Sequence, residues 1–430
     1  MSDNAPSNPN ASNSTTPKVP PRHAPMDQFS VDGNELLVAG TPLTRLAARV
    51  GQTPFFAYDT RVLAARIDEL RAVLPREVKL HYAIKANPMP VLVAFMAQRV
   101  DGLDVASGKE LSVALNAGVD GGISAREMSF AGPGKSAQEL EQAVAAGVLL
   151  NVESFREARV LADIGQRTGW KPRIAVRVNP DFELKSSGMK MGGGPKQFGV
   201  DAEQVPALLA EIGKLDLNFE GFHLYAGSQN LKAESIIEAQ QKSFELAIRL
   251  SESAPSPVTT LNLGGGFGIP YFAGESRLDL APVAANLADI VSRAKKLLPQ
   301  AEIVIELGRY LVGEAGIYVC RVVDKKVSRG QTFLVCDGGL HHHLAASGNF
   351  GQVIRKNYPA AIGNRMSSSA IENASIVGPL CTPLDLLGDR MDLPTAEPGD
   401  LVVIFQSGAY GYTASPRDFL SQPQPVEVLV

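Results

Sequence analysis

One lysine of this chain stands where a side-chain amine could do covalent chemistry. Lys85 ends the strand-like run KLHYAIK (79–85), and the Asn-Pro pair after it stops the strand, because proline has no amide donor for a ladder. Alternate side chains of a strand share a face, so we expect Lys85 to project with His81 and Ala83. An amine held at the mouth of an apolar barrel can lose its proton and attack an aldehyde to form a Schiff base. The alternative is a lysine that lays its stem on apolar surface and keeps its charge in water.

Three glycines and a serine further along are placed to hold an anion. Gly264, Gly265 and Gly266 follow a strand-like run, and glycine lets backbone N–H groups approach an anion without interference from Cβ. Ser228 ends the preceding strand and could add its hydroxyl to such a site. A plain tight turn is the competing interpretation of the glycine triplet.

A carboxylate and a guanidinium close the last strand-like run, ELGR (306–309). A carboxylate at the mouth of a sheet must be paired, solvated or functional. One interpretation is a structural ion pair between Glu306 and Arg309. In the other, Glu306 keeps a heterocyclic nitrogen protonated as an electron sink, and Arg309 faces an anion.

Two further reactive side chains lie near the end of the chain, Cys381 in GPLCTPLD and Tyr410 in GAYGY. A free cysteine is often only a small buried hydrophobe, so an inert thiol is the alternative to a catalytic one. The Tyr410 phenol could reach the site, and simple aromatic packing explains it equally well.

Two segments invite functions that we weigh against plainer ones. The triplet His341-His342-His343 suggests a metal, but consecutive residues of an extended segment point to opposite faces and cannot readily bind one ion. We therefore predict no metal site. The glycine-rich, basic stretch Lys185–Gly199 is interpreted as either a mobile lid or an ordinary surface loop.

Composition describes a soluble globular chain and excludes several partners. The 430 residues are 45% apolar and 20% charged with a net charge of −4, which gives no electrostatic basis for binding nucleic acid or anionic membrane. The three cysteines lack C-x-x-C spacing, so we expect no disulfide framework and a cytoplasmic location. No apolar run is long enough to span a bilayer, and residues 1–26 are expected to be a disordered tail.

Eight short apolar runs alternate with amphipathic helical stretches, which is typical of βαβ units and a parallel sheet. Eight such units over about 250 residues predict a (β/α)8 TIM barrel. A doubly wound sheet would need a first-turn G-x-G-x-x-G, which the chain lacks. The predicted strands are 79–85, 102–107, 128–131, 149–154, 173–179, 219–228, 259–263 and 303–309.

After about residue 311 the pattern changes to β-branched runs separated by Gly, Pro and Asp, which predicts a mostly β domain. Residues 29–40 have the same character. We therefore expect a strand segment over 27–50 that packs on the β domain, a cofactor-binding barrel over 51–310 and the β domain over 311–430.

Taken in order, these segments resemble the fold-type III pyridoxal 5'-phosphate (PLP) decarboxylases, the diaminopimelate and ornithine decarboxylase superfamily. The resemblance covers about residues 45–425 and rests on HYAIKAN (81–87), DVASGKE (104–110), GSQ (227–229), GGGFG (264–268), ELGR (306–309), the Cys381 segment and GAYG (408–411). It implies an alanine racemase-like barrel, a PLP cofactor and a homodimer whose active sites form between subunits.

The resemblance also implies individual roles. Lys85 is expected to be the Schiff-base lysine and Glu306 the partner of the pyridine nitrogen. Cys381 is expected to reach a partner subunit's site and help protonate the carbanion left by loss of CO2. The implied cofactor contacts are Lys85, Asp104, Arg177, Tyr225, Ser228, Gly264, Gly265, Gly266, Glu306, Arg309 and Tyr410, and the implied substrate contacts are Arg309, Thr382, Tyr410 and Phe419.

The chain departs from the family pattern in ways that bear on the substrate. Tyr225 stands where the family commonly stacks a histidine on the cofactor ring, with His223 two residues earlier, so which of the two contacts the ring is left open. Leu307 replaces a proline. Thr382 replaces the acidic residue that reads a distal amine, and HHHLAASGNF (341–350) replaces an Arg-Pro segment that diaminopimelate decarboxylases carry.

These departures favour an acidic, neutral or carrier-protein-tethered, glutamyl-like amino acid, because a site for a buried ammonium normally retains a carboxylate. HHHLAASGNFGQ, MKMGGG and CTPLD resemble the subgroup that contains the decarboxylase of a carrier-protein-linked glutamyl group and exosortase-associated relatives. The substrate is thus a small amino acid or an acyl-carrier-protein thioester. The alternatives are a diaminopimelate decarboxylase making L-lysine, and a racemase or a non-catalytic PLP-binding homologue.

Overall fold

The computed structural model describes residues 23–183, 189–190, 192–350, 352 and 355–430. Within this part of the chain, eight parallel strands close on themselves in the order β9-β12-β14-β15-β5-β6-β7-β8, and β8 pairs with β9. The predicted (β/α)8 barrel is therefore confirmed. Its strands are β5 (Val78–Ala83), β6 (Gly102–Val105), β7 (Met128–Phe130), β8 (Leu149–Val152), β9 (Arg173–Asn179), β12 (Asn218–Leu224), β14 (Thr260–Gly265) and β15 (Glu302–Leu307).

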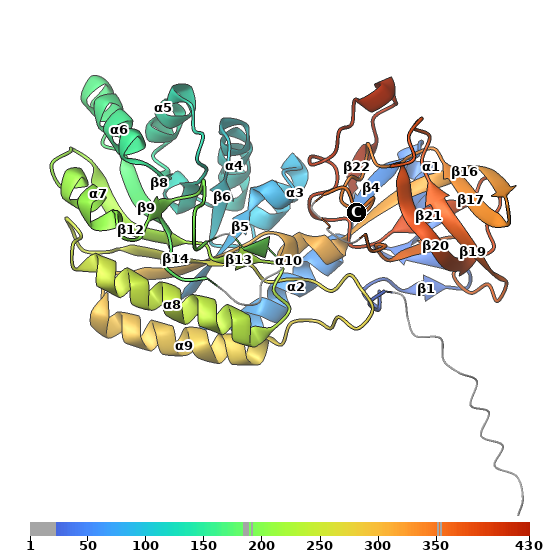
Figure 1. Ribbon diagram of the computed structural model, residues 1–430, viewed down its shortest axis with the longest axis horizontal. Helices are drawn as coiled ribbons and strands as arrows, with labels where there is room; N and C mark the ends of the chain where they lie inside the picture. Colours follow the sequence, from blue (N-terminus) through green and yellow to red (C-terminus); the bar gives the residue numbers. More distant parts are fainter. Residues whose placement is uncertain (1–22, 184–188, 191, 351, 353–354) are drawn as a thin grey trace, which may run out of the picture.

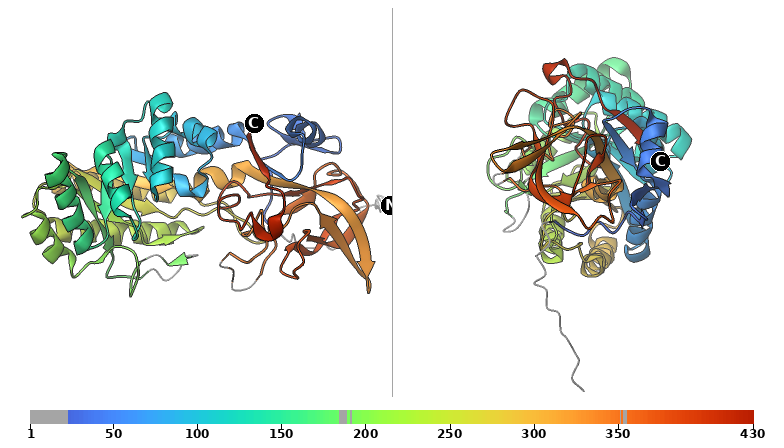
Figure 2. Two further views of the ribbon diagram at one scale, coloured as in Figure 1. Left: turned by 90° about the horizontal axis from the view of Figure 1, so that it is seen from above. Right: turned by 90° about the vertical axis from the view of Figure 1, so that its right-hand side faces the viewer.

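Helices surround the barrel and cover the outer faces of its strands (Figures 1 and 2). None of the described helices is both long and apolar enough to cross a membrane. The barrel helices are α2 (Thr60–Val73), α3 (Pro90–Ala97), α4 (Gly108–Gly121), α5 (Ala137–Ala146), α6 (Phe155–Thr168), α7 (Val205–Ile212), α8 (Ala233–Ser251), α9 (Leu280–Leu297) and α10 (Arg309–Val312), with short 3-10 turns η1 (Ile84–Ala86), η2 (Ala125–Glu127) and η3 (Gly313–Ala315).

Helices α4, α5 and α6 begin and end in the same way. A serine side chain accepts the N–H of the third helical residue at each start, and a glycine in the left-handed region ends each helix. These local signals mark the ends of the three helices in the sequence itself. The capping serines are Ser107, Ser136 and Ser154, and the terminal glycines are Gly122, Gly147 and Gly169.

A second, mostly β unit follows the barrel (Figure 1). In the described residues it is an eight-stranded sheet in which the long strand β16 pairs antiparallel with β17, β21 and β4. Its strands are β4 (Phe55–Tyr58), β16 (Gly316–Ser328), β17 (Gln331–Cys336), β18 (Ala360–Ile362), β19 (Ile371–Val377), β20 (Leu386–Pro394), β21 (Leu401–Ile404) and β22 (Val426–Leu429), and η4 (Phe419–Ser421) precedes the last of them.

The N-terminal residues pack against this second sheet. The small meander β1 (Val31–Asp32), β2 (Glu35–Val38) and β3 (Thr41–Pro42) with α1 (Leu43–Val50) packs in an apolar cluster with residues of β16 and β21. Strand β4 lies inside the range 51–310 assigned to the barrel from sequence, yet it pairs with β16 and β22. A run of four buried residues, FFAY, does not show which of two sheets it joins.

The expected disordered tail, 1–26, lies mostly outside the described residues. Its described end is packed on the barrel: Ala24 is buried, and its N–H donates to the Tyr271 carbonyl at 3.3 Å. The expectation of disorder does not hold for residues 23–26, because Ala24 bonds to Tyr271 and Met26 packs on the apolar cluster of the β unit, and the local sequence reveals neither contact.

Two local details change how the barrel presents its functional groups. Strand β5 ends at Ala83, so Lys85 lies in η1 and not at the end of the strand as the alternation argument assumed. Ser228 lies in β13 (Gly227–Ser228), which pairs antiparallel with β10 (Met189–Lys190), and the short β11 (Val200–Asp201) extends β9. In both cases the chain leaves the barrel strand before the residue that carries the chemistry.

The β unit contacts the barrel beside the lysine. The Tyr410 N–H donates to the Ala86 carbonyl at 2.8 Å, and the Asn87 amide donates to the Gly408 carbonyl at 3.0 Å. Only glycine fits at position 408 of this junction, because a Cβ there would lie 1.8 Å from the Val312 carbonyl oxygen. The junction brings the GAYG segment to the C-terminal ends of the barrel strands.

Candidate active site

A cavity of about 210 Å³ opens at the C-terminal ends of the barrel strands. This is the end at which TIM barrels carry their active sites. Most of its lining comes from the ends of β5, β12, β14 and β15 and the loops after them, and the β unit adds a phenylalanine and a tyrosine. The lining residues are Ala83, Lys85, Tyr225, Ser228, Gln229, Gly266, Phe267, Glu306, Leu307, Gly308, Arg309, Phe350 and Tyr410.

Lys85 presents its amine to this cavity. The residue is open to solvent through the cavity, and its Nζ lies 5.5 Å from the centre of the Tyr225 ring. Burial opposes the charged form, but Tyr410, Tyr225 and Glu306 raise the pKa of Lys85 overall. The amine therefore stands among polar groups and not in the apolar surroundings that the sequence suggested. Burial in turn raises the pKa of Tyr225 to about 12.

Glu306, at the end of β15, is buried and faces the same cavity. Burial alone would raise its pKa, but His223, followed by Lys85 and Arg177, holds the pKa of Glu306 well below its usual range. His223 Nε2 lies 3.2 Å from Glu306 Oε2. His223 thus lies against the carboxylate, while Tyr225 lines the cavity. The two aromatic residues that the sequence left open as contacts of a cofactor ring therefore occupy different positions.

The glycine triplet divides into two kinds of position. Gly266 lines the cavity, whereas Gly264 and Gly265 do not. A Cβ on Gly265 would lie 2.0 Å from the Glu306 carbonyl oxygen, and Gly264 has φ +69° with the Leu224 carbonyl oxygen 2.7 Å from an added Cβ. Gly266 is equally confined, with φ +77° and the Gly227 carbonyl oxygen 2.1 Å from an added Cβ, so close backbone approach explains all three glycines. The anion-binding interpretation concerns Gly266 with Ser228, because both line the cavity.

Arg309 is held by a group of tyrosines. Its Nη1 donates to the Tyr271 hydroxyl at 2.7 Å, and its guanidinium carbon lies 4.8 Å from the centre of the Tyr410 ring. Burial opposes the charge, but Tyr271, Tyr358 and Tyr410 raise the pKa of Arg309 overall. Arg309 forms no ion pair with Glu306 within the described residues, so the structural pair considered from sequence is absent there and the cation stays available to an anion.

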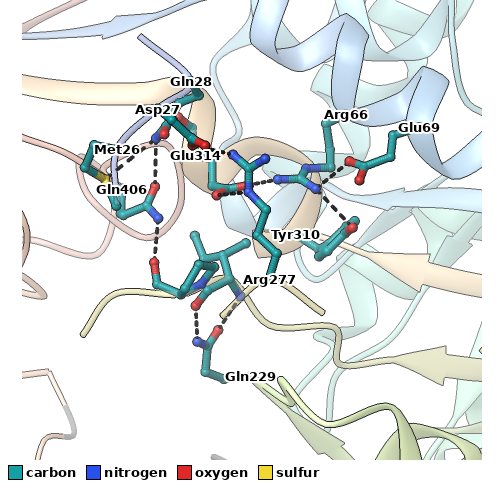
Figure 3. A network of polar contacts seen from close by, with 12 residues as sticks. Met26, Asp27, Gln28, Arg66, Glu69, Gln229, Arg277, Tyr310, Glu314 and Gln406 are labelled. Atoms are coloured by element: carbon teal, nitrogen blue, oxygen red, sulfur yellow. Dashed lines mark hydrogen bonds and ion pairs between the residues drawn. The ribbon is translucent and has the colours of Figure 1, made fainter. Parts of the chain in front are cut away.

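A polar network behind the cavity fixes the loop that follows Gly266 (Figure 3). The Gln229 side chain donates to the Ile269 carbonyl at 2.6 Å and accepts the Ile269 N–H at 3.3 Å. Gln406, from the β unit, donates to the Pro270 carbonyl at 2.6 Å. At the far end of the loop Arg277 pairs with Glu314, which also pairs with Arg66. The loop that carries Tyr271 is thus anchored from both structural units.

Two expected cofactor residues lie below the cavity lining. Asp104 is buried and bonds His81 Nδ1 at 3.1 Å and the Ser129 hydroxyl at 2.5 Å. Burial opposes protonation of His81, but Asp104 raises its pKa overall. Arg177 is buried and pairs with Glu153 at 3.0 Å. Both side chains belong to the polar interior of the barrel and not to the cavity surface.

The expected substrate residues of the β unit do not line the cavity of their own chain. Cys381 is exposed, Thr382 is half-buried and Phe419 is 44% exposed. The turn before Cys381 is fixed by the buried Asp385, which accepts the N–H groups of Leu340 and Leu380. The segment is therefore anchored by Asp385, but Cys381 and Thr382 do not line the cavity.

The histidine triplet lies in a turn beside the β sheet, not in the extended segment that the sequence argument assumed. His342 lies 3.1 Å from the Tyr318 hydroxyl and 2.8 Å from the Pro423 carbonyl, and His343 lies 2.9 Å from the Ser407 hydroxyl. Burial lowers the pKa of His343 to about 3. In the described residues no group of three side chains is arranged to hold a metal ion. Part of the proposed lid Lys185–Gly199, namely 185–188 and 191, lies outside those residues.

Several lining residues were not identified from the sequence. Gln229 directly follows Ser228 in GSQ and could have been found from that position, because it shares the turn. Phe350 lies far along the chain in the segment after the histidines and carried no local signal. Phe267 and Gly308 follow residues that were identified, and they reach the cavity through the same loops.

The donor set can be tested against a cofactor that has an aldehyde, a ring nitrogen and a phosphate. A primary amine suits the aldehyde, a buried carboxylate suits a protonated ring nitrogen, and an arginine with a hydroxyl and a glycine turn suits the phosphate. Lys85, Glu306 and Arg309 all line one cavity. The residues present therefore fit PLP, and the fold and cavity define a PLP-binding barrel enzyme.

Comparison with known proteins gives the family. Residues 61–313 match the family described as "Pyridoxal-dependent decarboxylase, pyridoxal binding domain". The chain is 38% identical to L-glutamyl-[BtrI acyl-carrier protein] decarboxylase of Niallia circulans, covering 90% of each chain. It is 33% identical to a diaminopimelate decarboxylase of Aquifex aeolicus, covering 92% of this chain and 90% of the relative. The chain belongs to the PLP-dependent amino-acid decarboxylases.

A solved structure supports the same assignment. Diaminopimelate decarboxylase from Helicobacter pylori, complexed with L-lysine, superposes with a TM-score of 0.77 at 29% identity, covering 90% of this chain and 94% of that one. The chain is thus a PLP-dependent carboxy-lyase with the family's two-part architecture.

Proposed function

We propose that this decarboxylase acts on an acidic, neutral or carrier-protein-tethered, glutamyl-like amino acid. The supporting observation is the charge of the site: Glu306 is the one acidic side chain among the described lining residues, and it faces the cofactor position. Thr382, which stands where a carboxylate would read a distal amine, is uncharged. A substrate ammonium far from the reacting carbon would have no partner there.

In this proposal each residue of the site has a separate role. Lys85 holds the cofactor aldehyde and later moves a proton at the reacting carbon. Glu306 holds a proton on the ring nitrogen, and Arg309, Ser228 and Gly266 bind the phosphate. PLP, when bound, takes up the electron pair left as CO2 departs. Tyr225 and Tyr410 border the space beside the Lys85 amine, so they limit how the substrate is oriented.

The active unit that we propose is a homodimer with shared sites. Cys381 and Phe419 face solvent in one chain, and so does Leu384, which is 60% exposed. A second copy placed over this segment would bury these apolar side chains and bring Cys381 to the cavity of the other subunit, where its thiol could supply a proton. Mixing Lys85→Ala and Cys381→Ala proteins tests this arrangement. Activity should return only in the mixture, and two inactive proteins that stay inactive when mixed would contradict it.

The comparison with named relatives supports a tethered substrate. The Niallia circulans relative acts on a glutamyl group carried by an acyl-carrier protein, as its name states. The segments HHHLAASGNFGQ, MKMGGG and CTPLD, the last of which contains the neutral Thr382, are the features by which the sequence resembles the subgroup that contains such a decarboxylase.

Diaminopimelate decarboxylation is the second candidate, since relatives of that name match over nine-tenths of the chain. Its substrate needs a cation for the distal carboxylate. Arg309 is the one arginine among the described lining residues, and nearby Arg355 instead donates to the carbonyls of Ser347 and Leu386 at 3.0 and 2.6 Å. The observed contacts of Arg355 therefore disfavour any substrate with a free distal carboxylate, and among the proposed substrates they favour one whose distal carboxyl group is tethered to a carrier protein.

Mass-spectrometric detection of amine products from the PLP-loaded enzyme decides between them. The panel contains meso-diaminopimelate, lysine, ornithine, arginine, glutamate, and glutamate thioesterified to a carrier protein. Turnover of the thioester or of free glutamate alone would support the proposal. Conversion of meso-diaminopimelate to lysine at ordinary enzyme rates would overturn it and support the second candidate.

A further inference from the structure

The interior of the barrel directly below the cavity is polar, whereas TIM barrels usually fill this space with branched apolar side chains. Buried polar groups are costly unless they are paired, so a whole layer of them calls for a reason. Seven strands supply the layer: Asp104 (β6), Ser129 (β7), Asn151 (β8), Arg177 (β9), His223 (β12), Asn262 (β14) and Glu306 (β15) are all buried.

Two members of this layer touch the same atom of Glu306. The Asn262 side-chain nitrogen donates to Glu306 Oε2 at 3.2 Å, and His223 Nε2 lies 3.2 Å from that same oxygen. Asn262 is 6% exposed and His223 1% exposed, so water does not compete for either contact. Within the described residues no hydrogen bond reaches the other oxygen, Oε1, and Glu306 lines the cavity. The two contacts thus leave one carboxylate oxygen for the cavity.

The orientation of the Asn262 amide follows from its other contact. Its Oδ1 accepts the Gly264 N–H at 2.8 Å, and a backbone N–H can only donate, so the oxygen must lie on that side. The amide nitrogen is then directed at the carboxylate. Asn262 therefore joins Glu306 to the first glycine of the turn that leads to Gly266.

We propose that Asn262 and His223 are positioning residues that hold Glu306 Oε2, so that Oε1 faces the ring nitrogen of the cofactor. This inference rests on the proposed role of Glu306. It adds that the carboxylate is aligned from below by two strands, β12 and β14, and that Asn262 couples this alignment to the glycine turn. Asn262 and His223 act through Glu306 and do not themselves line the cavity.

The test compares PLP with deaza-PLP, in which carbon replaces the ring nitrogen. Dissociation constants of both for apo-protein are measured by fluorescence titration, and their ratio reports recognition of the nitrogen alone. General damage to the fold weakens both ligands and cancels in the ratio. Asn262→Ala should reduce the preference for PLP by about tenfold, the effect of one hydrogen bond to a charged group. His223→Leu removes the 3.2 Å contact with the same oxygen and should also reduce the preference for PLP, while the Asn262–Gly264 hydrogen bond stays in place. This variant replaces Asn262→Ala in the test if that one does not fold.

Two further variants separate the possible failures. Glu306→Gln sets the loss expected when nitrogen recognition is removed, and Asn151→Ala truncates a buried amide of the same layer that contacts Ser129 and not Glu306. If Glu306→Gln lowers the preference while Asn262→Ala and His223→Leu do not, the positioning inference is overturned and the role of Glu306 stands. If Glu306→Gln leaves the preference unchanged, the role of Glu306 fails, and the inference fails with it. An equal loss in Asn151→Ala would also overturn the inference, since the effect would then belong to the whole layer.

Discussion

The barrel part and the β-unit part of the proposed active site differ in the contacts that their own chain provides. Glu306, on the barrel side, is buried among contacts from β12 and β14, and Lys85 lies in a lined cavity. Cys381, on the side of the β unit, is exposed on a turn that Asp385 anchors firmly. The barrel residues meet in a cavity of their own chain, whereas the anchored Cys381 turn does not line that cavity. The proposed homodimer with shared sites would give this turn a cavity to act on.

The largest expected effect comes from removing the Lys85 amine in the barrel cavity. Lys85→Ala should reduce product formation by more than about 10⁴-fold, the upper range for one proton-transfer group, because covalent attachment of the cofactor is lost as well. Borohydride treatment followed by intact-mass measurement should show PLP fixed to the natural chain and not to the variant. Lys79→Ala, at the other end of the same strand-like run, is the matched control and should keep both properties. Retained attachment in Lys85→Ala would place the reactive amine elsewhere.

The second prediction concerns Cys381, on the exposed turn of the β unit. Cys381→Ala should lower kcat by about 10² to 10⁴-fold, as loss of a proton donor does, while the free energy of unfolding stays the same because the residue is exposed. Cys320→Ala is the matched control, since Cys320 is fully buried in β16. It should instead cost about 1 kcal/mol of stability and leave kcat unchanged. Equal kcat in both variants would remove Cys381 from the mechanism.

A pH effect should arise in the β unit. The pKa of His343 falls to about 3 on folding because burial disfavours its charged form. The unfolded chain therefore binds more protons below about pH 6.5, and the stability from the neutral ring is present above that pH and is lost as the pH falls. At pH 5 the loss should be about 2 kcal/mol. Urea unfolding at pH 7 and pH 5 measures it, and His343→Gln should reduce the difference. An unchanged difference would mean that His343 does not contribute to it.

The smallest effect concerns specificity. Thr382→Glu restores a carboxylate next to Cys381 and should raise kcat/KM for ornithine or lysine relative to the natural substrate by about tenfold, which corresponds to about 1.4 kcal/mol of charge pairing. Competition assays with paired substrates measure the ratio directly. A matched Thr382→Gln variant has nearly the same shape without the charge and should leave the ratio as it was. If both variants behave alike, this position does not read the substrate side chain.

The barrel could be predicted because its signals are local. Each strand is a short apolar run, and capping residues such as Ser136 and Gly147 mark the ends of the helices between them. Strand β4 falls inside the range 51–310 that was assigned to the barrel, because a short, fully buried run does not show which unit it joins. The motifs around Lys85, Glu306 and Arg309 were found for the same local reason, and their meeting in one cavity followed from the rule that barrel loops converge.

The order of the strands and the types of residue at their ends could be read from the sequence alone. The tertiary structure decided the rest. It placed Lys85 in a 3-10 turn, brought Gly266 but not Gly264 or Gly265 to the cavity, and set Asn262 and His223 against one carboxylate oxygen. Those contacts join residues far apart in the chain, and the Asn262–Glu306 bond spans 44 positions. Hydrogen bonds depend on distance and direction between atoms, and only the closed barrel fixes both.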